Sequence, residues 1–210
     1  MKRKILWQTF LAVLQTITGA GLVIFLAVHL FGSSMINFGE TGFNAYTTHL
    51  DHSNLLIQGL IFLIAVAVFA HGLNGLRIVW RYFKKGKEVH QYLINMKYRD
   101  SFLWYVHFAT GIFMGLFVTV HLIVDCFGAK EAITTAEIVK TRLQNDWYLA
   151  CMILLLVCVI FHACCGTRNI LIKYGLLPKH QRKIQIALLI GGLAITIFGI
   201  HNLWLFRSLP

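Results

Sequence analysis

Five long apolar stretches constrain this chain more than any other feature of its sequence. Each is longer than the roughly 20 residues that a helix needs to cross a membrane, and none has an acidic residue in its middle. Hydrophobic residues make up 58% of the 210 residues and charged residues only 13%. The sequence therefore predicts an all-α integral membrane protein, a single membrane domain over 1–210. The five expected helices cover about 7–32, 54–80, 102–126, 147–172 and 184–206.

The charges indicate how these helices are oriented. The chain has 19 Lys and Arg residues and only 8 Asp and Glu residues, and most of the basic ones fall on one side of the expected membrane. Because basic residues are concentrated in cytoplasmic loops, the pattern predicts a cytoplasmic N-terminus and an external C-terminus. No basic stretch is interleaved with aromatic residues in the manner of a nucleic-acid groove, so we expect no nucleic-acid partner.

Two sequence patterns recur at almost the same offset. The first and third stretches share a motif that ends in histidine, and the second and fourth share the motif H-x-x-x-G-x-R. The histidines repeat at offsets of 92 and 91 residues. Such a repeat predicts a duplicated helical hairpin, with the fifth helix added to it. The matching positions are Gln15, Thr18, Gly19 and His29 with His107, Thr110, Gly111 and His121, and His71, Gly75 and Arg77 with His162, Gly166 and Arg168.

Four of the ten histidines fall into two layers when depth in the membrane is considered. His29 and His121 lie near the outer ends of the first and third helices. His71 and His162 lie shortly before the cytoplasmic arginines of the second and fourth helices. At 1.5 Å of rise per residue, the two layers are expected to lie roughly 20–25 Å apart along the helices.

Paired histidines on facing helices suit one chemistry in particular. Two neutral imidazoles can ligate a planar haem iron from both faces, and helix bundles hold cofactors in their cores. The repeated glycines would let a ring lie against the helix backbone. With both axial positions filled, such a haem carries electrons rather than activating oxygen. The alternative is that these are hydrogen-bonding histidines between helices, with glycines that serve packing. The paired layers favour two haems.

The remaining histidines are expected to have smaller roles. His107 lies 14 residues before His121, but a second ligand there needs a partner helix with the same spacing, and the matching place holds Gln15. We therefore expect His107 to be a polar partner near the inner haem or a quinone. His201, near the outer end of the fifth helix, has no repeat partner. Loop histidines with no expected role are His49, His52, His90 and His180.

Taken together, these residues resemble a known family, the dihaem cytochrome b membrane subunit of succinate:quinone oxidoreductases, especially quinol:fumarate reductases. The resemblance rests on one histidine in each of the first four helices and on three local strings. They are HLFGSS from His29, DSFLWYVHFATG from Asp100 and HACCGTRNILIKYG from His162.

The resemblance implies two b haems, the outer one bound by His29 and His121 and the inner one by His71 and His162. It also implies menaquinone or menaquinol as the substrate. A flavoprotein subunit with FAD and an iron–sulfur subunit would dock on the cytoplasmic face of a bacterial inner membrane, and the resemblance leaves room for a dimer of complexes. We expect the basic loop 77–99 to be the docking surface. Residues that match contacts of the haem propionates are Gln15, Thr16, Trp104 and Lys173.

Two departures from the family pattern concern protons. Some members have a glutamate two residues before the histidine of the fourth helix, where this chain has Ile160, so we expect no carboxylate relay through the helices. The glutamate of the outer quinone site has no secure counterpart. Asp51, and less well Glu40, are the acids expected to serve there, because quinol oxidation releases protons.

Two other readings of the sequence remain open. A dihaem cytochrome b of a nitrate reductase or hydrogenase would place its ligands on helices in other combinations. A haem-free scaffold or transporter would commonly have helices broken at mid-membrane. Here proline occurs only at Pro178 and Pro210, outside the apolar stretches.

Overall fold

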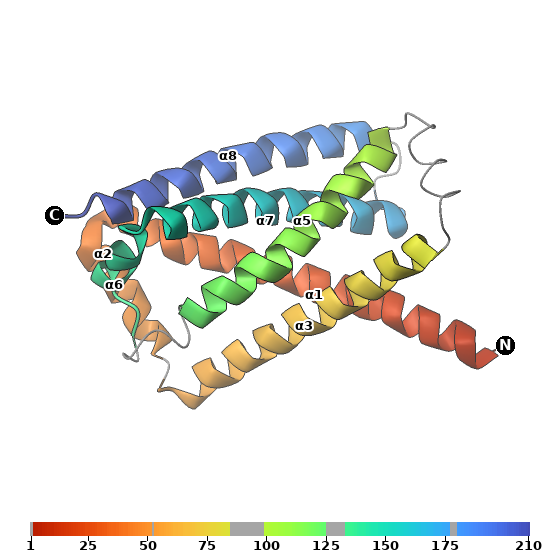
Figure 1. The fold of residues 1–210 in the computed structure, drawn as a ribbon, viewed down its shortest axis with the longest axis horizontal. Coiled ribbons are helices and arrows are strands. Elements are labelled where there is room, and N and C mark those ends of the chain that lie inside the picture. Colours follow the sequence, from red (N-terminus) through yellow and green to blue (C-terminus); the bar gives the residue numbers. More distant parts are fainter. Residues whose placement is uncertain (1, 52, 85–98, 125–132, 177–179) are drawn as a thin grey trace.

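The computed structural model describes residues 2–51, 53–84, 99–124, 133–176 and 180–210. Within these ranges, five helices are long and apolar enough to cross a membrane, which confirms the expected fold class (Figure 1). They are α1 (Lys2–Ser34), α3 (Leu55–Lys84), α5 (Arg99–Leu122), α7 (Asp146–Lys173) and α8 (Gln181–Arg207).

The long helices extend beyond most of the predicted bounds. The apolar stretch marks only the part that must lie in hydrocarbon, whereas the backbone continues its hydrogen bonding into the interface. Thus α1 begins at Lys2 rather than near residue 7, and α3 continues to Lys84. The third helix is the exception at its end, because α5 stops at Leu122. The predicted end at 126 lies outside the described residues.

The helices pack as two hairpins and one added helix. Helix α1 packs along α3, α5 packs along α7, and α8 packs on the other side of α7 (Figure 1). Helix α1 also contacts α7 and α8, which joins the first hairpin to the rest of the bundle. This arrangement has the hairpins that the sequence repeat predicts.

Short helices that the sequence analysis did not predict lie between the long ones. They are η1 (Met35–Phe38), α2 (Gly39–Thr47), η2 (Thr48–Leu50) and α6 (Ala136–Leu143). Gly39 permits the turn between η1 and α2, because its φ of 78° is in the left-handed region. The Thr135 hydroxyl accepts a bond from Ile138 N and so caps α6. The Asn44 side chain in α2 accepts a second bond, from Ala136 N at 2.8 Å.

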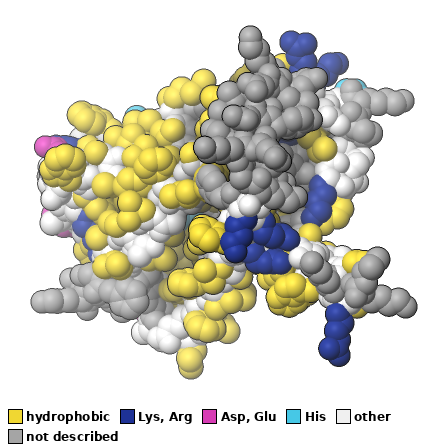
Figure 2. Space-filling view, turned by 45° about the vertical axis from the view of Figure 1, so that its right-hand side comes forward, with side chains coloured by type: hydrophobic (Ala, Val, Ile, Leu, Met, Phe, Trp, Pro, Cys, Tyr) yellow, Lys and Arg dark blue, Asp and Glu magenta, His cyan; other side chains and the backbone are white. Residues whose placement is uncertain are grey.

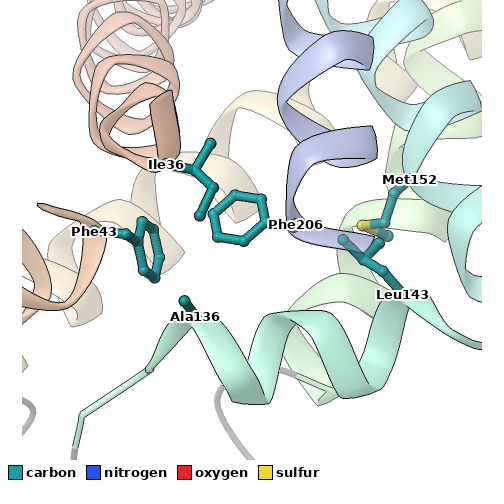
Figure 3. Packing of buried hydrophobic residues seen from close by; sticks show 6 residues of the cluster. All are labelled: Ile36, Phe43, Ala136, Leu143, Met152 and Phe206. Atoms are coloured by element: carbon teal, nitrogen blue, oxygen red, sulfur yellow. The ribbon is translucent and has the colours of Figure 1, made fainter. Parts of the chain in front are cut away.

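These short helices and the C-terminal end of α8 form a compact unit, which we call the cap. Its apolar core is the main buried cluster among the described residues (Figure 3). The rings of Phe43 and Phe206 meet edge to face, with centroids 4.8 Å apart. The members of the cluster are Ile36, Phe43, Ala136, Leu143, Met152 and Phe206.

The flanks of the bundle are apolar, as expected for lipid-facing helices. Large hydrophobic side chains such as Leu55, which is 83% exposed, cover them. In Figure 2, lysine and arginine side chains lie mostly over the end turned toward the viewer, and acidic side chains lie at the opposite, left edge. Basic residues near the end of α3, the end of α7 and the start of α8 are Arg81, Lys84, Lys173, Arg182 and Lys183. Part of the predicted docking loop, residues 85–98, lies outside the described residues.

Candidate functional site

Four histidines meet as two pairs, each of which joins one hairpin to the other. The rings of His29 on α1 and His121 on α5 have centroids 6.0 Å apart and planes at 74°. The rings of His71 on α3 and His162 on α7 have centroids 6.3 Å apart and planes at 77°. We call them the outer pair and the inner pair, after the orientation that the charges predict. The structure thus brings together the partners that the depth argument paired.

The separation of the rings fits ligation of one iron by each pair. Two imidazoles on opposite faces of a metal, each with its nitrogen about 2 Å from it, have ring centres roughly 6 Å apart. Both pairs have this spacing. Among the described residues, no group of three or more His, Cys, Asp or Glu side chains is placed to hold a metal. The donor sets therefore suit a haem, whose macrocycle supplies the other ligands, better than a bare metal ion.

The tautomer of His71 is set by a hydroxyl from the neighbouring helix. Thr18 Oγ1 lies 3.2 Å from His71 Nδ1 and donates its own proton to the carbonyl of Leu14 at 2.7 Å. The hydroxyl oxygen therefore accepts the Nδ1–H bond, which leaves the lone pair on Nε2. In this structure the Gln15 amide donates to that nitrogen, at 3.2 Å. Since one lone pair serves one partner, an iron bound to His71 Nε2 would replace this amide.

His162 has the same tautomer by a matching arrangement. Its Nδ1 lies 3.4 Å from Thr110 Oγ1 and 3.0 Å from the carbonyl of His107. Thr110 donates its proton to the carbonyl of Val106 at 2.8 Å, so its oxygen also accepts. Donation from Nδ1 again leaves Nε2 as the nitrogen with a free lone pair. A backbone carbonyl or hydroxyl on the second ring nitrogen is how proteins commonly orient metal-binding histidines.

Two glycines make room for the inner pair. A Cβ on Gly19 would lie 3.0 Å from Cε1 of His71, and one on Gly111 would lie 3.1 Å from Cε1 of His162. Each glycine thus lets an imidazole from the other helix of its hairpin lie against the backbone. The sequence predicts that a ring lies against these glycines, but it does not identify which ring. The orientation of neighbouring helices about their axes decides this, and one sequence does not contain it.

His107 and Gln15 occupy equivalent places in the repeat and contact the inner pair. The ring of His107 stacks on that of His162, with centroids 3.9 Å apart and planes at 17°. Its Nδ1 is buried and has no hydrogen-bond partner within the described part of the chain. Gln15 bonds to His71 on the other side. The structure therefore places His107 against the inner pair, where the sequence analysis expected a polar partner.

Asn74, which the sequence analysis did not single out, supports Gln15. It is 6% exposed, and its amide donates to Gln15 Oε1 at 2.9 Å and to the carbonyl of Leu11 at 2.8 Å. Its own oxygen accepts a long bond from Arg77, at 3.4 Å. The sequence does mark Asn74, because it is a polar residue three positions after His71, on the same face of an otherwise apolar helix.

The residues matched to propionate contacts by resemblance are only partly brought together. Lys173 reaches from α7 to α1, where its ammonium donates to Thr16 Oγ1 at 2.9 Å and to the carbonyl of Ala12 at 3.0 Å. Trp104 packs on Tyr105 and stacks on Phe108 within its own helix. Gln15 is bonded to His71 and Asn74, as described above.

The acids proposed for a quinone site lie beside the cap. The carboxylate of Asp51 accepts bonds from the backbone N–H and the hydroxyl of Ser53, both at 2.8 Å, and so stabilises the turn before α3. Glu40 is exposed in the first turn of α2. Of the remaining histidines, His201 is exposed on α8 and His49 and His180 are exposed at helix ends. His52 and His90 lie outside the described residues.

The fold and these contacts define a multi-pass helical membrane protein with two layers of paired imidazoles between duplicated hairpins. Comparison with known sequences gives the family. The sequence profile described as "Succinate dehydrogenase/Fumarate reductase transmembrane subunit" matches residues 5–97 and again residues 83–200. The chain belongs to this family.

Individual relatives agree with this assignment. A fumarate reductase cytochrome b subunit of Helicobacter pylori is 29% identical over 172 residues, which are 77% of this chain and 66% of the relative. A succinate dehydrogenase hydrophobic membrane anchor subunit of Thermoplasma acidophilum is 28% identical over 105 residues, which are 50% of this chain and 85% of the relative. This chain thus spans just under two thirds of the length of the Helicobacter protein.

Proposed function

We propose that this chain is the dihaem membrane anchor of a fumarate reductase or succinate dehydrogenase complex. It passes electrons between menaquinone or menaquinol and an iron–sulfur subunit. The observation that carries the proposal is the pair of ring separations, 6.0 Å and 6.3 Å, at the two layers of the repeat. Bound there, two b haems supply one-electron carriers at two depths in the membrane.

The side chains of this chain orient the ligand atoms and exclude competing chemistry. His71 and His162 offer Nε2 lone pairs because their Nδ1 protons are held by Thr18 and Thr110. A haem held by both histidines of a pair would supply electron transfer and would not bind a substrate at its metal. The apolar side chains of the helices keep the sites in a medium of low polarity.

Quinol oxidation releases protons, and Asp51 is our candidate for a carboxylate that accepts them at the outer side. Its place directly before α3 and beside the cap supports this choice over the more exposed Glu40. A carboxylate there would accept protons released when a quinol is oxidised. Position 160 is an isoleucine, buried in α7, so no carboxylate two residues before His162 carries protons through the helices.

The partners are a flavoprotein subunit with FAD and an iron–sulfur subunit on the cytoplasmic face of a bacterial inner membrane. Support comes from the basic side chains that gather at one end of the bundle, since such residues concentrate on the cytoplasmic side (Figure 2). The docking surface includes the described ends of α3 and α7. Dimers of the complex are compatible with the apolar flanks.

Purification of the tagged chain from its native membranes tests the proposal. We expect a flavoprotein and an iron–sulfur protein to copurify, and the complex to transfer electrons from a menaquinol analogue to fumarate. Its dithionite-reduced spectrum should have the bands of b haem. A stable, correctly folded preparation without haem or without these partners would contradict the proposal.

A further inference from the structure

Two threonines of the repeat have a role that ligation by histidine alone does not explain. Thr18 and Thr110 occupy equivalent positions in the two hairpins, 92 residues apart, each followed by the glycine that accommodates an inner imidazole. Each hydroxyl oxygen lies at Nδ1 of an inner histidine, at 3.2 Å from His71 and 3.4 Å from His162.

The hydroxyls are acceptors toward the histidines because their protons are already used. Thr18 donates to Leu14 O at 2.7 Å, and Thr110 donates to Val106 O at 2.8 Å. Threonines in apolar helices often make this bond to the preceding turn without any further role. Thr119 on α5 is such a case, since it donates to Gly115 O at 2.7 Å and is exposed. What distinguishes Thr18 and Thr110 is the imidazole nitrogen on the other side of the oxygen.

We propose that Thr18 and Thr110 are positioning residues of the inner pair, which hold Nδ1 protonated and so aim the Nε2 lone pairs at the metal. The inference rests on the proposed function, because it assigns roles around the inner haem. An acceptor on Nδ1–H makes an imidazole a more basic ligand, which stabilises ferric over ferrous iron. The inner haem therefore has a lower midpoint potential with these hydroxyls than without them.

The two threonines do not contribute equally. His162 Nδ1 also donates to the carbonyl of His107 at 3.0 Å, which is closer than the Thr110 hydroxyl, and its ring is stacked on that of His107. For His71, Thr18 Oγ1 is the acceptor that the structure gives to Nδ1. A side-chain change at position 110 leaves a backbone acceptor in place, whereas a change at position 18 removes the hydroxyl that holds His71. Loss of the Thr18 hydroxyl therefore changes the potential of the inner haem more than loss of the Thr110 hydroxyl.

Valine substitutions in the purified complex test this assignment. Valine keeps the branched shape and removes the hydroxyl. We expect Thr18→Val to raise the midpoint potential of one haem and to shift its low-spin electron paramagnetic resonance signal. Thr110→Val should shift the same haem by less, Thr18→Ser should restore the parent values, and the other haem should not change. Thr119→Val, on α5 with the same backbone bond, is the matched control and should leave both haems as they are.

Several results would overturn the inference. They are an unchanged inner-haem potential in Thr18→Val, an equal or larger shift in Thr110→Val, or the same shift in Thr119→Val. If Thr18→Val does not assemble, Thr18→Ala removes the hydroxyl without the branched methyl groups and gives the same readout. His71→Ala separates the inference from the proposed function. If it removes one haem while Thr18→Val shifts nothing, only the positioning role fails. If it removes none, the proposed ligation fails.

Discussion

The inner and outer pairs have nearly the same ring separation in different surroundings. The inner rings are half-buried, and their Nδ1 atoms are held by threonines of the neighbouring helix. In the outer pair, His29 is exposed and its ring stacks on Phe25 of the same helix, with centroids 5.6 Å apart. Threonine hydroxyls of the repeat thus lie at the inner rings, and an aromatic ring of α1 lies against one of the outer rings.

The surroundings of the outer pair extend this contrast. Gly32, one turn after His29, lies against the ring of Tyr46 in α2, where a Cβ would be 2.6 Å from Tyr46 Cε1. The glycine of α1 at this level therefore accommodates the cap and not a histidine. The glycine near the outer pair thus has a different neighbour from the two glycines at the inner pair.

The largest expected effect is the loss of one layer when a ligand is removed. His71→Ala and His162→Ala should each lower the haem content from about two per chain to about one, because each haem would be held by both histidines of one pair and would bind less tightly with one of them removed. His29→Ala and His121→Ala should do the same, with loss of the other haem. Pyridine haemochrome assays and redox titration measure both quantities. His201→Ala, exposed on α8, is the control and should keep both haems. Loss of the same haem from all four variants would break the two-layer account.

The next effect compares a buried amide beside the inner pair with a buried amide in the cap. Asn74→Leu removes bonds to Gln15 and Leu11 and leaves the Gln15 carbonyl without its donor. We expect a loss of about 2 kcal/mol in stability, together with a changed spectrum of the inner haem. Asn202→Leu removes the bond from Asn37, at 2.8 Å, in the cap. This variant should lower stability without changing the spectrum of either haem. Thermal unfolding in detergent, followed at the haem band, distinguishes the two, and equal spectral effects would contradict the contrast.

A smaller effect follows from filling the space at the inner rings. An alanine at Gly19 or Gly111 places a methyl group about 3 Å from an imidazole carbon, which we expect to cost about 1 kcal/mol and to rotate that ring. The matched controls are Gly21→Ala on α1 and Gly115→Ala on α5, because their Cβ positions have no described atom within 4 Å. Electron paramagnetic resonance of the ferric haems reports ring orientation. If the control variants changed the spectrum as much as the Gly19 and Gly111 variants, the two glycines would not be what makes room for the inner rings.

The smallest effect on the haems is expected at the outer acid. Asp51→Asn should leave the haem content and the spectra unchanged and lower the rate of quinol oxidation. Turnover with a menaquinol analogue, measured against pH, tests this, and Glu40→Gln tests the second candidate acid in the same way. Since Asp51 also accepts two bonds from Ser53, thermal unfolding of the variant separates a local loss of structure from a loss of proton transfer. Unchanged turnover would remove Asp51 from the quinone site.

Much of this architecture could be predicted from the sequence because its signals are strong and local. Apolar length gives the five helices, and the offsets of the repeated histidines give the partners that the structure brings together. Depth along a helix follows from residue number, so His29 with His121 and His71 with His162 needed no tertiary information. The same repeat marked Gln15 with His107 and Thr18 with Thr110 as equivalent positions.

The remaining contacts depend on how each helix is rotated about its axis, which residue spacing does not fix. The stacking of His107 on His162 and the bond of Gln15 to His71 are of this kind. The cap escaped prediction for another reason. Its helices are short and less apolar, and they are stabilised by contacts distant in sequence, such as that of Phe43 with Phe206.

The ratio of haem to polypeptide in the purified complex tests the central claim most directly. The account predicts about two b haems for each chain, which a redox titration should resolve as two carriers. Each ligand variant should lose one of these two carriers. A ratio near one would mean that one histidine pair only packs helices together. A colourless but folded and assembled protein would contradict the claim for both pairs.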